Sequence, residues 1–281
     1  MAESLKHPIS TSGFKFDNYQ RNAYLETKGV PGPKLTKTGT TIVGIIFKDG
    51  VILGADTRAT TDTIVSDKNC LKIHFIADNI YCCGAGTAAD TDVVTRMIAA
   101  QIKLHCLTTG RICPVMTANR LLKQHLFKYH GFLGVAGILG GVDMSGPSLY
   151  SIAPAGSTHK MQYSSMGSGS LAAMATLEKR WERDMPLEDG MRLVRDAIAG
   201  GIFSDLGSGS NIDLCVITMS GCKFIRPLEV PNKKGKMQQT YRYRPGVTSV
   251  ISSKVTPLEV VECTVRNFSD SASEDSSVDE D

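Results

Sequence analysis

The bond between Gly39 and Thr40 is the point in this sequence where the residue types suggest a reaction. If this peptide bond is cut, Thr40 becomes a new N-terminus that carries a hydroxyl and a free α-amine on one residue. The hydroxyl is then the nucleophile, and the amine, with a reference pKa of about 7.7–8.0, accepts its proton near neutral pH. An internal threonine has no such base, so we expect the chemistry to be silent until residues 1–39 are removed.

Thr40 begins a predicted β-hairpin, which would hold it at the mouth of a buried strand. Two apolar runs rich in β-branched residues, 40–47 and 51–56, flank the sequence Lys48-Asp49-Gly50. Asp-Gly between such runs is a strong signal for a short hairpin. This stretch alone also fits an ordinary hairpin in which Thr40 merely starts a strand, so the nucleophile needs support from the rest of the chain.

Hydrophobic patterning predicts that strands and pairs of helices alternate along residues 40–230. Short apolar runs predict the strands, at residues 40–47, 51–56, 63–65, 73–76, 80–83, 133–142, 149–153, 213–219 and 223–230. Apolar residues spaced three and four apart predict the helices, at residues 91–107, 117–129, 170–181 and 186–199. This order favours an α+β fold, in which helix pairs cover two sheets packed face to face, over a βαβ sheet.

Glycines are expected to end two of these elements. Gly84-Ala85-Gly86 should break the strand at 80–83, and Gly200-Gly201 should stop the fourth helix.

The two ends of the chain differ in composition from its middle. Residues 1–39 are polar and lack periodicity, which predicts a detachable, poorly ordered leader, although an ordinary flexible N-terminus has the same composition. After residue 230 the pattern dissolves into an expected arm, residues 231–268, with a short strand near 248–252. Residues 269–281 hold six acids and no base, which is typical of a disordered tail.

Composition argues against several other classes of protein. The formal net charge is +3 at pH 7 and no basic cluster stands out, so we expect no nucleic-acid-binding surface. The eight cysteines are scattered without CxxC or Cys/His spacing, which predicts free thiols in a reducing compartment and no metal site. No apolar stretch is long enough to span a bilayer, and residues 1–20 lack the apolar core of a signal peptide.

Several segments, taken in order, resemble the catalytic β-subunits of the eukaryotic 20S proteasome. They are TTIVGIIFKDGVILGADTRAT from Thr40, then Lys72, GAGTAAD from Gly84, MGSGS from Met166 and SDLGSGSNIDLCVI from Ser204. The resemblance covers residues 36–230, and GTAADTD, GGVD and PNKKG are similar to the β2, trypsin-like type. It implies the N-terminal nucleophile hydrolase fold, a four-layer αββα sandwich. It also implies a threonine-type endopeptidase that uses neither metal nor organic cofactor, with residues 1–39 as a propeptide and 40–230 as the catalytic domain.

The resemblance assigns roles to individual residues. Thr40 would be the nucleophile, freed when the chain cuts its own bond after Gly39. Asp56 and Lys72 would form a charged pair beside it, in which the lysine lowers the pKa of the Thr40 amine and stabilises the alkoxide. Further catalytic roles fall on the backbone N–H of an oxyanion donor and on polar groups around the amine, namely Gly86, Ser168, Asp205 and Ser208. Surface charges and ordinary glycine-serine turns are the alternative explanation for the same residues.

The resemblance also implies a pocket for the substrate residue that precedes the cleaved bond. Gly84 would leave room at its wall, and Asp92 at its base would attract lysine or arginine, which predicts trypsin-like cleavage. An acid in a first helical turn is also favoured by the helix dipole, by about 0.3–1 kcal/mol, so Asp92 has an alternative explanation. Thr60 would offer its backbone to the substrate strand. The remaining pocket residues are expected to be Ala59, Cys70, His74 and Ala88.

The implied setting is the stacked-ring core particle of the cytoplasm and nucleus. There the chain would lie beside other β-subunits and an α-ring, with its arm around a neighbour, and would cleave unfolded polypeptides. Ubiquitin-dependent degradation and production of antigenic peptides are the implied roles, without membrane or nucleic-acid partners, for a constitutive or an inducible subunit.

Two other functions stay open at this point. One is a non-catalytic, structural β-subunit, which has no need of Gly39, Thr40, Asp56 and Lys72 together. The other is a small-molecule amidase of the same fold, against which the segment GSGSNIDLCVI and the long arm argue.

Overall fold

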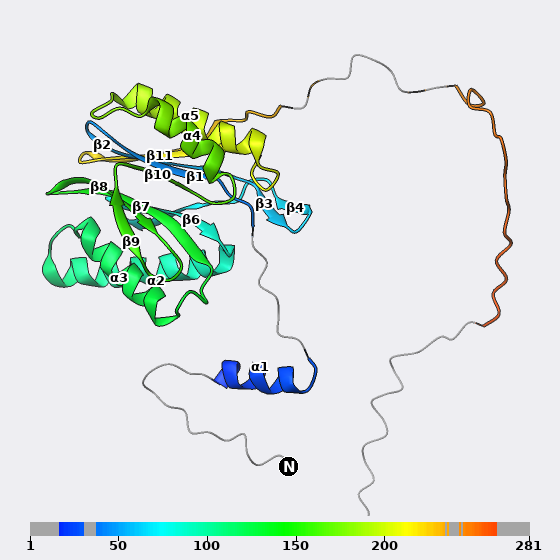
Figure 1. The fold of residues 1–281 in the computed structure, drawn as a ribbon, viewed down its shortest axis with the longest axis horizontal. Helices are drawn as coiled ribbons and strands as arrows, with labels where there is room; N and C mark the ends of the chain where they lie inside the picture. The colour runs from blue at the N-terminus through cyan, green and yellow to red at the C-terminus, as the bar shows by residue number, and fades with distance from the viewer. Residues whose placement is uncertain (1–16, 31–37, 234, 236–241, 243, 263–281) are drawn as a thin grey trace, which may run out of the picture. The chain divides into compact units, whose positions relative to one another are not determined.

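The computed structural model describes residues 17–30, 38–233, 235, 242 and 244–262 of the 281-residue chain. The chain divides into two units, residues 1–234 and 235–281. The first unit contains two five-stranded sheets that lie face to face, with two helices over the outer face of each sheet (Figure 1). The predicted α+β fold with four αββα layers is therefore confirmed.

The first sheet is built on the predicted hairpin and has the strand order β10-β1-β2-β11-β12. Its strands pair antiparallel and are β1 Ile42–Phe47, β2 Gly50–Asp56, β10 Tyr163–Met166, β11 Ile212–Thr218 and β12 Gly221–Glu229. Phe47 pairs with Gly50, so the turn is as short as the Asp-Gly signal predicted. Because β2 pairs with β1 on one side and β11 on the other, Asp56 at its end lies beside segments distant in sequence.

The second sheet has the order β5-β6-β7-β8-β9 and is also antiparallel. Its strands are β5 Ile73–Ala77, β6 Ile80–Gly86, β7 Val135–Asp143, β8 Gly146–Ile152 and β9 Thr158–Met161. A separate two-stranded ribbon, β3 Ala59–Thr61 with β4 Ile64–Asp67, follows β2.

Two pairs of helices complete the layers. They are α2 Ala88–Thr109 with α3 Val115–Lys128, and α4 Ser170–Arg180 with α5 Leu187–Ser204. Three hydrophobic clusters fill the three interfaces: one beneath each helix pair and one between the two sheets. The predicted apolar helix faces are thus the faces that are buried, for example Ile98 and Ile102 of α2.

Two glycine-based predictions were wrong for one physical reason. β6 continues through Gly84-Ala85-Gly86, and α5 continues past Gly200-Gly201 to Ser204. A Cβ at Gly84 would lie 2.0 Å from Cγ2 of Thr91 on α2, and one at Gly201 would lie 2.4 Å from Oγ1 of Thr41. These glycines therefore permit close packing rather than end an element.

Other differences from the sequence predictions concern short polar segments. Strands β9 and β10 were not predicted, because THKM and YSSM lack an alternating apolar pattern. The leader, expected to be poorly ordered, contains helix α1 Asp17–Thr27. Residues 248–252 are described and form no strand, since nothing described in their own unit pairs with them. The acidic tail, 269–281, lies outside the described residues.

Among the described residues, no helix has the length and hydrophobicity to cross a membrane. The described part of the chain also contains no group of three or more His, Cys, Asp or Glu side chains that could hold a metal ion.

The adjacent glycines of α5 give a matched test of this packing. We expect Gly201→Ala to lower the free energy of unfolding by about 1–3 kcal/mol, because the new methyl group overlaps the buried side chain of Thr41. Gly200→Ala should instead raise it by up to about 1 kcal/mol, because the nearest atoms to a Cβ there lie at 3.7 Å and alanine favours a helix. Chemical denaturation of the two variants measures both effects, and equal stabilities would contradict this account of α5.

Candidate active site

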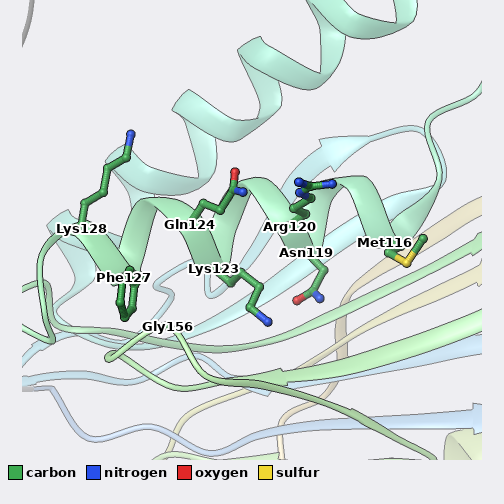
Figure 2. Close-up of a pocket in the computed structure, with 8 residues that line it drawn as sticks. All are labelled: Met116, Asn119, Arg120, Lys123, Gln124, Phe127, Lys128 and Gly156. Carbon is green, nitrogen blue, oxygen red and sulfur yellow. The ribbon is translucent and has the colours of Figure 1, made fainter.

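One large cavity in the described part of the chain lies away from the predicted site residues. A cavity of about 830 Å³ lies along α3, where Figure 2 shows its lining side chains with Gly156 opposite them. None of its eight lining residues is a predicted site residue. A smaller cavity, of about 280 Å³, is lined by Thr40 and Lys72 and contains most of the predicted pocket residues. The smaller cavity, which Thr40 lines, is therefore the candidate active site, although the cavity along α3 is larger.

Thr40 lies just before β1 and is held on both sides. Its backbone N–H donates to Oγ of Ser168 at 3.0 Å, and its carbonyl accepts from the N–H of Gly169 at 3.2 Å. The loop can come this close because Gly167 has a φ of +98°, and a Cβ there would lie 2.1 Å from the Thr40 carbonyl oxygen. The GSGS sequence after Met166 is thus a loop fitted around the predicted nucleophile.

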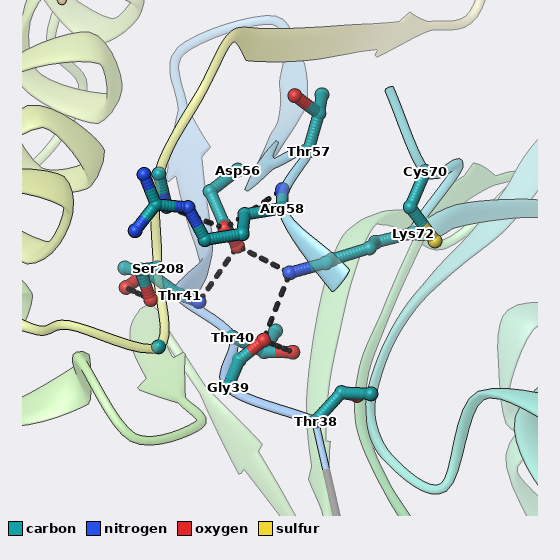
Figure 3. Close-up of polar contacts among 12 residues, drawn as sticks. Thr38, Gly39, Thr40, Thr41, Asp56, Thr57, Arg58, Cys70, Lys72 and Ser208 are labelled. Atoms are coloured by element: carbon teal, nitrogen blue, oxygen red, sulfur yellow. Dashed lines mark hydrogen bonds and ion pairs between the residues drawn. The ribbon is translucent and has the colours of Figure 1, made fainter. Parts of the chain in front are cut away.

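Asp56 and Lys72 form a buried ion pair next to Thr40. Nζ of Lys72 lies 2.7 Å from Oδ1 of Asp56, and the side chains are 6% and 0% exposed. Backbone N–H groups donate to the remaining positions on the carboxylate: Thr41 to Oδ1 at 2.9 Å, and Arg58 and Gly209 to Oδ2 at 3.2 and 3.1 Å. Figure 3 shows this carboxylate at the centre of the cluster. A buried charge with this many donors is fully compensated.

The carbonyl of Gly39 receives two donors. Nζ of Lys72 lies 3.1 Å from its oxygen, and the hydroxyl of Thr40 lies 2.7 Å from it (Figure 3). Hydrogen bonds to a carbonyl oxygen, above all from an ammonium, draw electrons from the carbonyl carbon and stabilise an oxyanion. The intact bond between Gly39 and Thr40 is therefore polarised by the groups around it.

A second polar group connects the nitrogen of Thr40 to a carboxylate. Oγ of Ser168, which accepts from that nitrogen, donates to Oδ2 of Asp205 at 2.6 Å, and Oγ of Ser208 donates to the same oxygen at 2.7 Å. Burial raises the pKa of Asp205, but hydrogen bonds from Ser168, Ser208 and the Gly207 N–H outweigh burial, and the net effect lowers the pKa. Asp205 is thus an ionised acceptor beneath the Thr40 nitrogen.

The residues before the Gly39–Thr40 bond lie against β6 of the second sheet and β3 of the two-stranded ribbon. The N–H and the hydroxyl of Thr38 donate to the carbonyl of Gly86, at 3.5 and 3.0 Å, and the two residues form an antiparallel bridge. The N–H of Gly39 donates to the side-chain hydroxyl of Thr60 at 3.1 Å, rather than to its backbone. Gly86 contributes its carbonyl to these contacts, so the predicted role of its N–H as an oxyanion donor stays a prediction.

The smaller cavity contains most of the predicted pocket. Cys70, His74, Gly84, Ala88 and Asp92 line it together with Thr40, as the resemblance implies. Ala59 and Thr60 are not in its lining, because they lie in β3 and pair with β4. Five further lining residues were not predicted, namely Thr38, Leu71, Ala85, Thr91 and Arg96.

Arg96 changes the charge of this pocket. Its Nε lies 3.0 Å from Oδ1 of Asp92, one helical turn away, and the side chains are 79% and 39% exposed. The spacing of four residues between an acid and a basic residue on a helix could have signalled this pair in the sequence. Burial lowers the pKa of His74 despite the nearby Asp92, so the imidazole is neutral near pH 7. The acid expected to select basic substrates therefore already has a cationic partner.

Comparisons with known proteins establish the family of this chain. Residues 36–217 match the sequence family described as proteasome subunit, and residues 231–265 match the family described as proteasome beta subunits C terminal. Proteasome subunit beta type-10 of Bos taurus is 52% identical over 259 residues, which cover 90% of this chain and 94% of that protein. Proteasome subunit beta type-7 of Dictyostelium discoideum is 52% identical over 250 residues, 89% and 94% of the two chains. The probable proteasome subunit beta type-2 of Schizosaccharomyces pombe is 51% identical over 243 residues, 86% and 91% of the two chains. This chain therefore belongs to the proteasome β-subunit family.

Proposed function

We propose that this chain is a precursor of a threonine endopeptidase subunit, which cuts its own Gly39–Thr40 bond and then cleaves polypeptides after basic residues. The observation that carries the proposal is the polarised carbonyl of Gly39, to which both Lys72 and the Thr40 hydroxyl donate. A structural subunit has no use for a buried ammonium on that carbonyl. The membership of this chain in the proteasome β-subunit family supports a place in the proteasome core particle, beside α- and β-rings, with proteins as substrates.

Self-cleavage follows from the contacts of the intact bond. Oγ1 of Thr40 attacks the carbonyl carbon of Gly39, and the electron pair of the C=O bond moves to the oxygen, where Lys72 stabilises it. The C–N bond then breaks, and the nitrogen of Thr40 takes up the proton that Oγ1 lost, while Ser168, itself held by Asp205, keeps that nitrogen in place. This leaves Gly39 as an ester on Oγ1. Water hydrolyses the ester to a Gly39 carboxylate, and Thr40 keeps a free hydroxyl and a free amine.

Turnover uses the same groups on a substrate. The freed amine accepts the hydroxyl proton while Oγ1 attacks the substrate carbonyl, and Lys72 stabilises the negative charge. The protonated Thr40 amine gives its proton to the substrate nitrogen, which leaves as an amine. The restored Thr40 amine then activates the water that hydrolyses the ester. Ser168, Asp205 and Ser208 orient the amine throughout, which is the role that their contacts in the precursor favour.

The leader itself indicates where a substrate strand would lie. Thr38 and Gly39 take extended positions against Gly86 and Thr60, so removal of the leader opens donors and acceptors on both sides of Thr40. An extended peptide would add to these edges by main-chain hydrogen bonds, with its side chain in the adjoining cavity. Basic side chains would reach Asp92 there and compete with Arg96 for it.

We also propose the cytoplasm and nucleus as the location and residues 231–268 as an arm around a neighbouring subunit. The match of residues 231–265 to the C-terminal family segment supports the arm. Large apolar residues in it are exposed in the isolated chain, among them Ile251 and Leu258 at 98% and 95%, as expected of a segment that another subunit covers.

Substitution of the nucleophile separates catalysis from architecture. We expect Thr40→Ala to leave the leader attached and to reduce cleavage after arginine by at least about 10³-fold, because no other residue supplies the hydroxyl. Thr40→Ser keeps a hydroxyl and an amine and should retain both reactions, more slowly. Cleavage of Arg-ended peptides by particles that carry each variant measures this, and full activity with Thr40→Ala would favour the structural subunit.

Asp205 controls how the amine titrates. Because hydrogen bonds lower its pKa, Asp205 is ionised near neutral pH, and its negative charge favours the protonated amine of Thr40. Asp205→Asn removes that charge, lowers the pKa of the amine, and should move the acidic limb of the pH profile of kcat/KM to lower pH, with a reduced maximum. Glu188→Gln on the surface of α5 is the control and should leave the profile unchanged. A limb that stays in place would mean that Asp205 does not face the amine.

Pocket charge gives an independent prediction about specificity. We expect Asp92→Asn to lower kcat/KM for Arg-ended peptides by about two- to fivefold, and Arg96→Gln to raise it by a similar factor, because exposed ion pairs are worth up to about 1 kcal/mol. Peptides that end in a neutral residue are the internal control, since neither variant should alter their cleavage through charge. An unchanged ratio of the two substrates in Arg96→Gln would show that Arg96 does not compete for the acid.

A further inference from the structure

Two cysteine side chains meet on neighbouring strands away from Thr40. Sγ of Cys215 on β11 lies 3.1 Å from Sγ of Cys222 on β12. We propose that Cys215 and Cys222 are a thiol modification site, which a hydroperoxide oxidises to a reversible disulfide. The proposal does not depend on the peptidase activity, because neither cysteine lines the cavity at Thr40.

Strand register brings these side chains to the same face. Cys215 pairs with Phe224 and Ile217 pairs with Cys222, so the two cysteines are diagonal neighbours separated by two residues along each strand. Side chains two apart on a strand share a face, which places both sulfur atoms on one side of the β11–β12 hairpin. A disulfide bond is about 2.05 Å long, so the two sulfur atoms must approach by about 1 Å to form it. Diagonal neighbours have Cα atoms about 7–8 Å apart, so closure also needs a small movement of the β11–β12 backbone.

The surroundings of the two thiols differ. They favour Cys222 as the thiol that reacts with peroxide and Cys215 as the thiol that then forms the disulfide with it. Cys222 is half-buried, and hydrogen bonds from Cys215 and from Tyr81 lower its pKa to about 7, despite burial. Cys215 is fully buried, and its hydrogen bond to Cys222 and its burial raise its pKa. A half-exposed thiolate next to a buried thiol is the arrangement that favours oxidation followed by disulfide formation.

The reaction balances with a hydroperoxide as the oxidant. The thiolate of Cys222 attacks one oxygen of hydrogen peroxide, the O–O bond breaks, and Cys222 becomes a sulfenic acid while hydroxide leaves and is protonated to water. The thiol of Cys215 then attacks the sulfenic sulfur, the S–S bond forms, and a second water leaves with the thiol proton. Two thiols have lost two electrons to one peroxide. An added thiol reductant reverses the change by exchange.

Cys82 and Cys83 on β6 provide a contrast within the same protein. Both are buried, and burial raises their pKa, to about 12 for Cys82 and well above the ordinary value for Cys83. Adjacent residues of a strand point to opposite faces, so these two sulfurs cannot bond to each other. They should stay reduced at peroxide concentrations that oxidise the pair on β11 and β12.

Peptide mapping of the full-length chain tests the proposal directly. The chain is exposed to hydrogen peroxide, denatured, alkylated and digested with trypsin, which leaves both cysteines in one peptide, residues 196–223. We expect this peptide to become lighter by two hydrogen atoms and to take up no alkyl group, and a thiol reductant to restore both alkylation sites. Peptide 73–96, which holds Cys82 and Cys83, should remain doubly alkylated and be oxidised at least about tenfold more slowly.

Two variants test which cysteine reacts with peroxide and which one then forms the disulfide. In Cys215→Ser, Cys222 should still form a sulfenic acid, which a dimedone probe captures, and no disulfide should form. In Cys222→Ser, Cys215 should stay alkylatable after the same exposure. The proposal is overturned if the wild-type peptide keeps two alkylation sites, if Cys222 ends as a sulfinic acid without a disulfide, or if Cys222→Ser loses alkylation at Cys215 as fast as the wild type.

Discussion

The ion pair between Asp56 and Lys72 is the interaction on which the rest of the site depends. The two side chains are almost completely buried, and removal of one partner of such a pair typically costs about 3–5 kcal/mol. Through backbone N–H groups, Asp56 holds the start of β1 at Thr41 and the loop at Gly209. Lys72 extends the same network to the Gly39 carbonyl. One pair thus fixes the nucleophile, its surroundings and the bond to be cut relative to one another.

A second constraint is steric, and glycine meets it. The backbone at Gly207 packs directly against Gly39, so a Cβ at Gly39 would lie 2.2 Å from Cα of Gly207. Gly167 and Gly201 approach Thr40 and Thr41 just as closely from other elements. These contacts explain why loops that look like ordinary turns have so many glycines here: a side chain at these positions would push the polar groups away from the Thr40 nitrogen.

Sequence patterns located the layers of this fold better than their edges. The hairpin at Lys48-Asp49-Gly50 and the apolar helix faces follow from local periodicity, and the residues that the resemblance assigns around Thr40 do come together. Patterns could not locate β9 or β10, because THKM and YSSM lack an alternating apolar pattern and β10 pairs with the distant strand β1. They also wrongly predicted that Gly84 and Gly201 end their elements. The sequence alone does not distinguish a glycine that ends a helix or strand from one that allows a neighbouring element to pack closely. Arg96 was not predicted, because the sequence does not show that this part of α2 lines the cavity next to Thr40, where Arg96 pairs with Asp92.

The central claim is that Thr40 becomes an N-terminus, and the mass of the mature chain tests it most directly. Intact-mass analysis and N-terminal sequencing of this chain, taken from purified core particles, would determine its first residue. We predict a chain that begins at Thr40, whose free amine is the base of the mechanism. A chain that still carries Gly39 in an assembled and active particle would contradict it, because the hydroxyl of Thr40 would then have no such base.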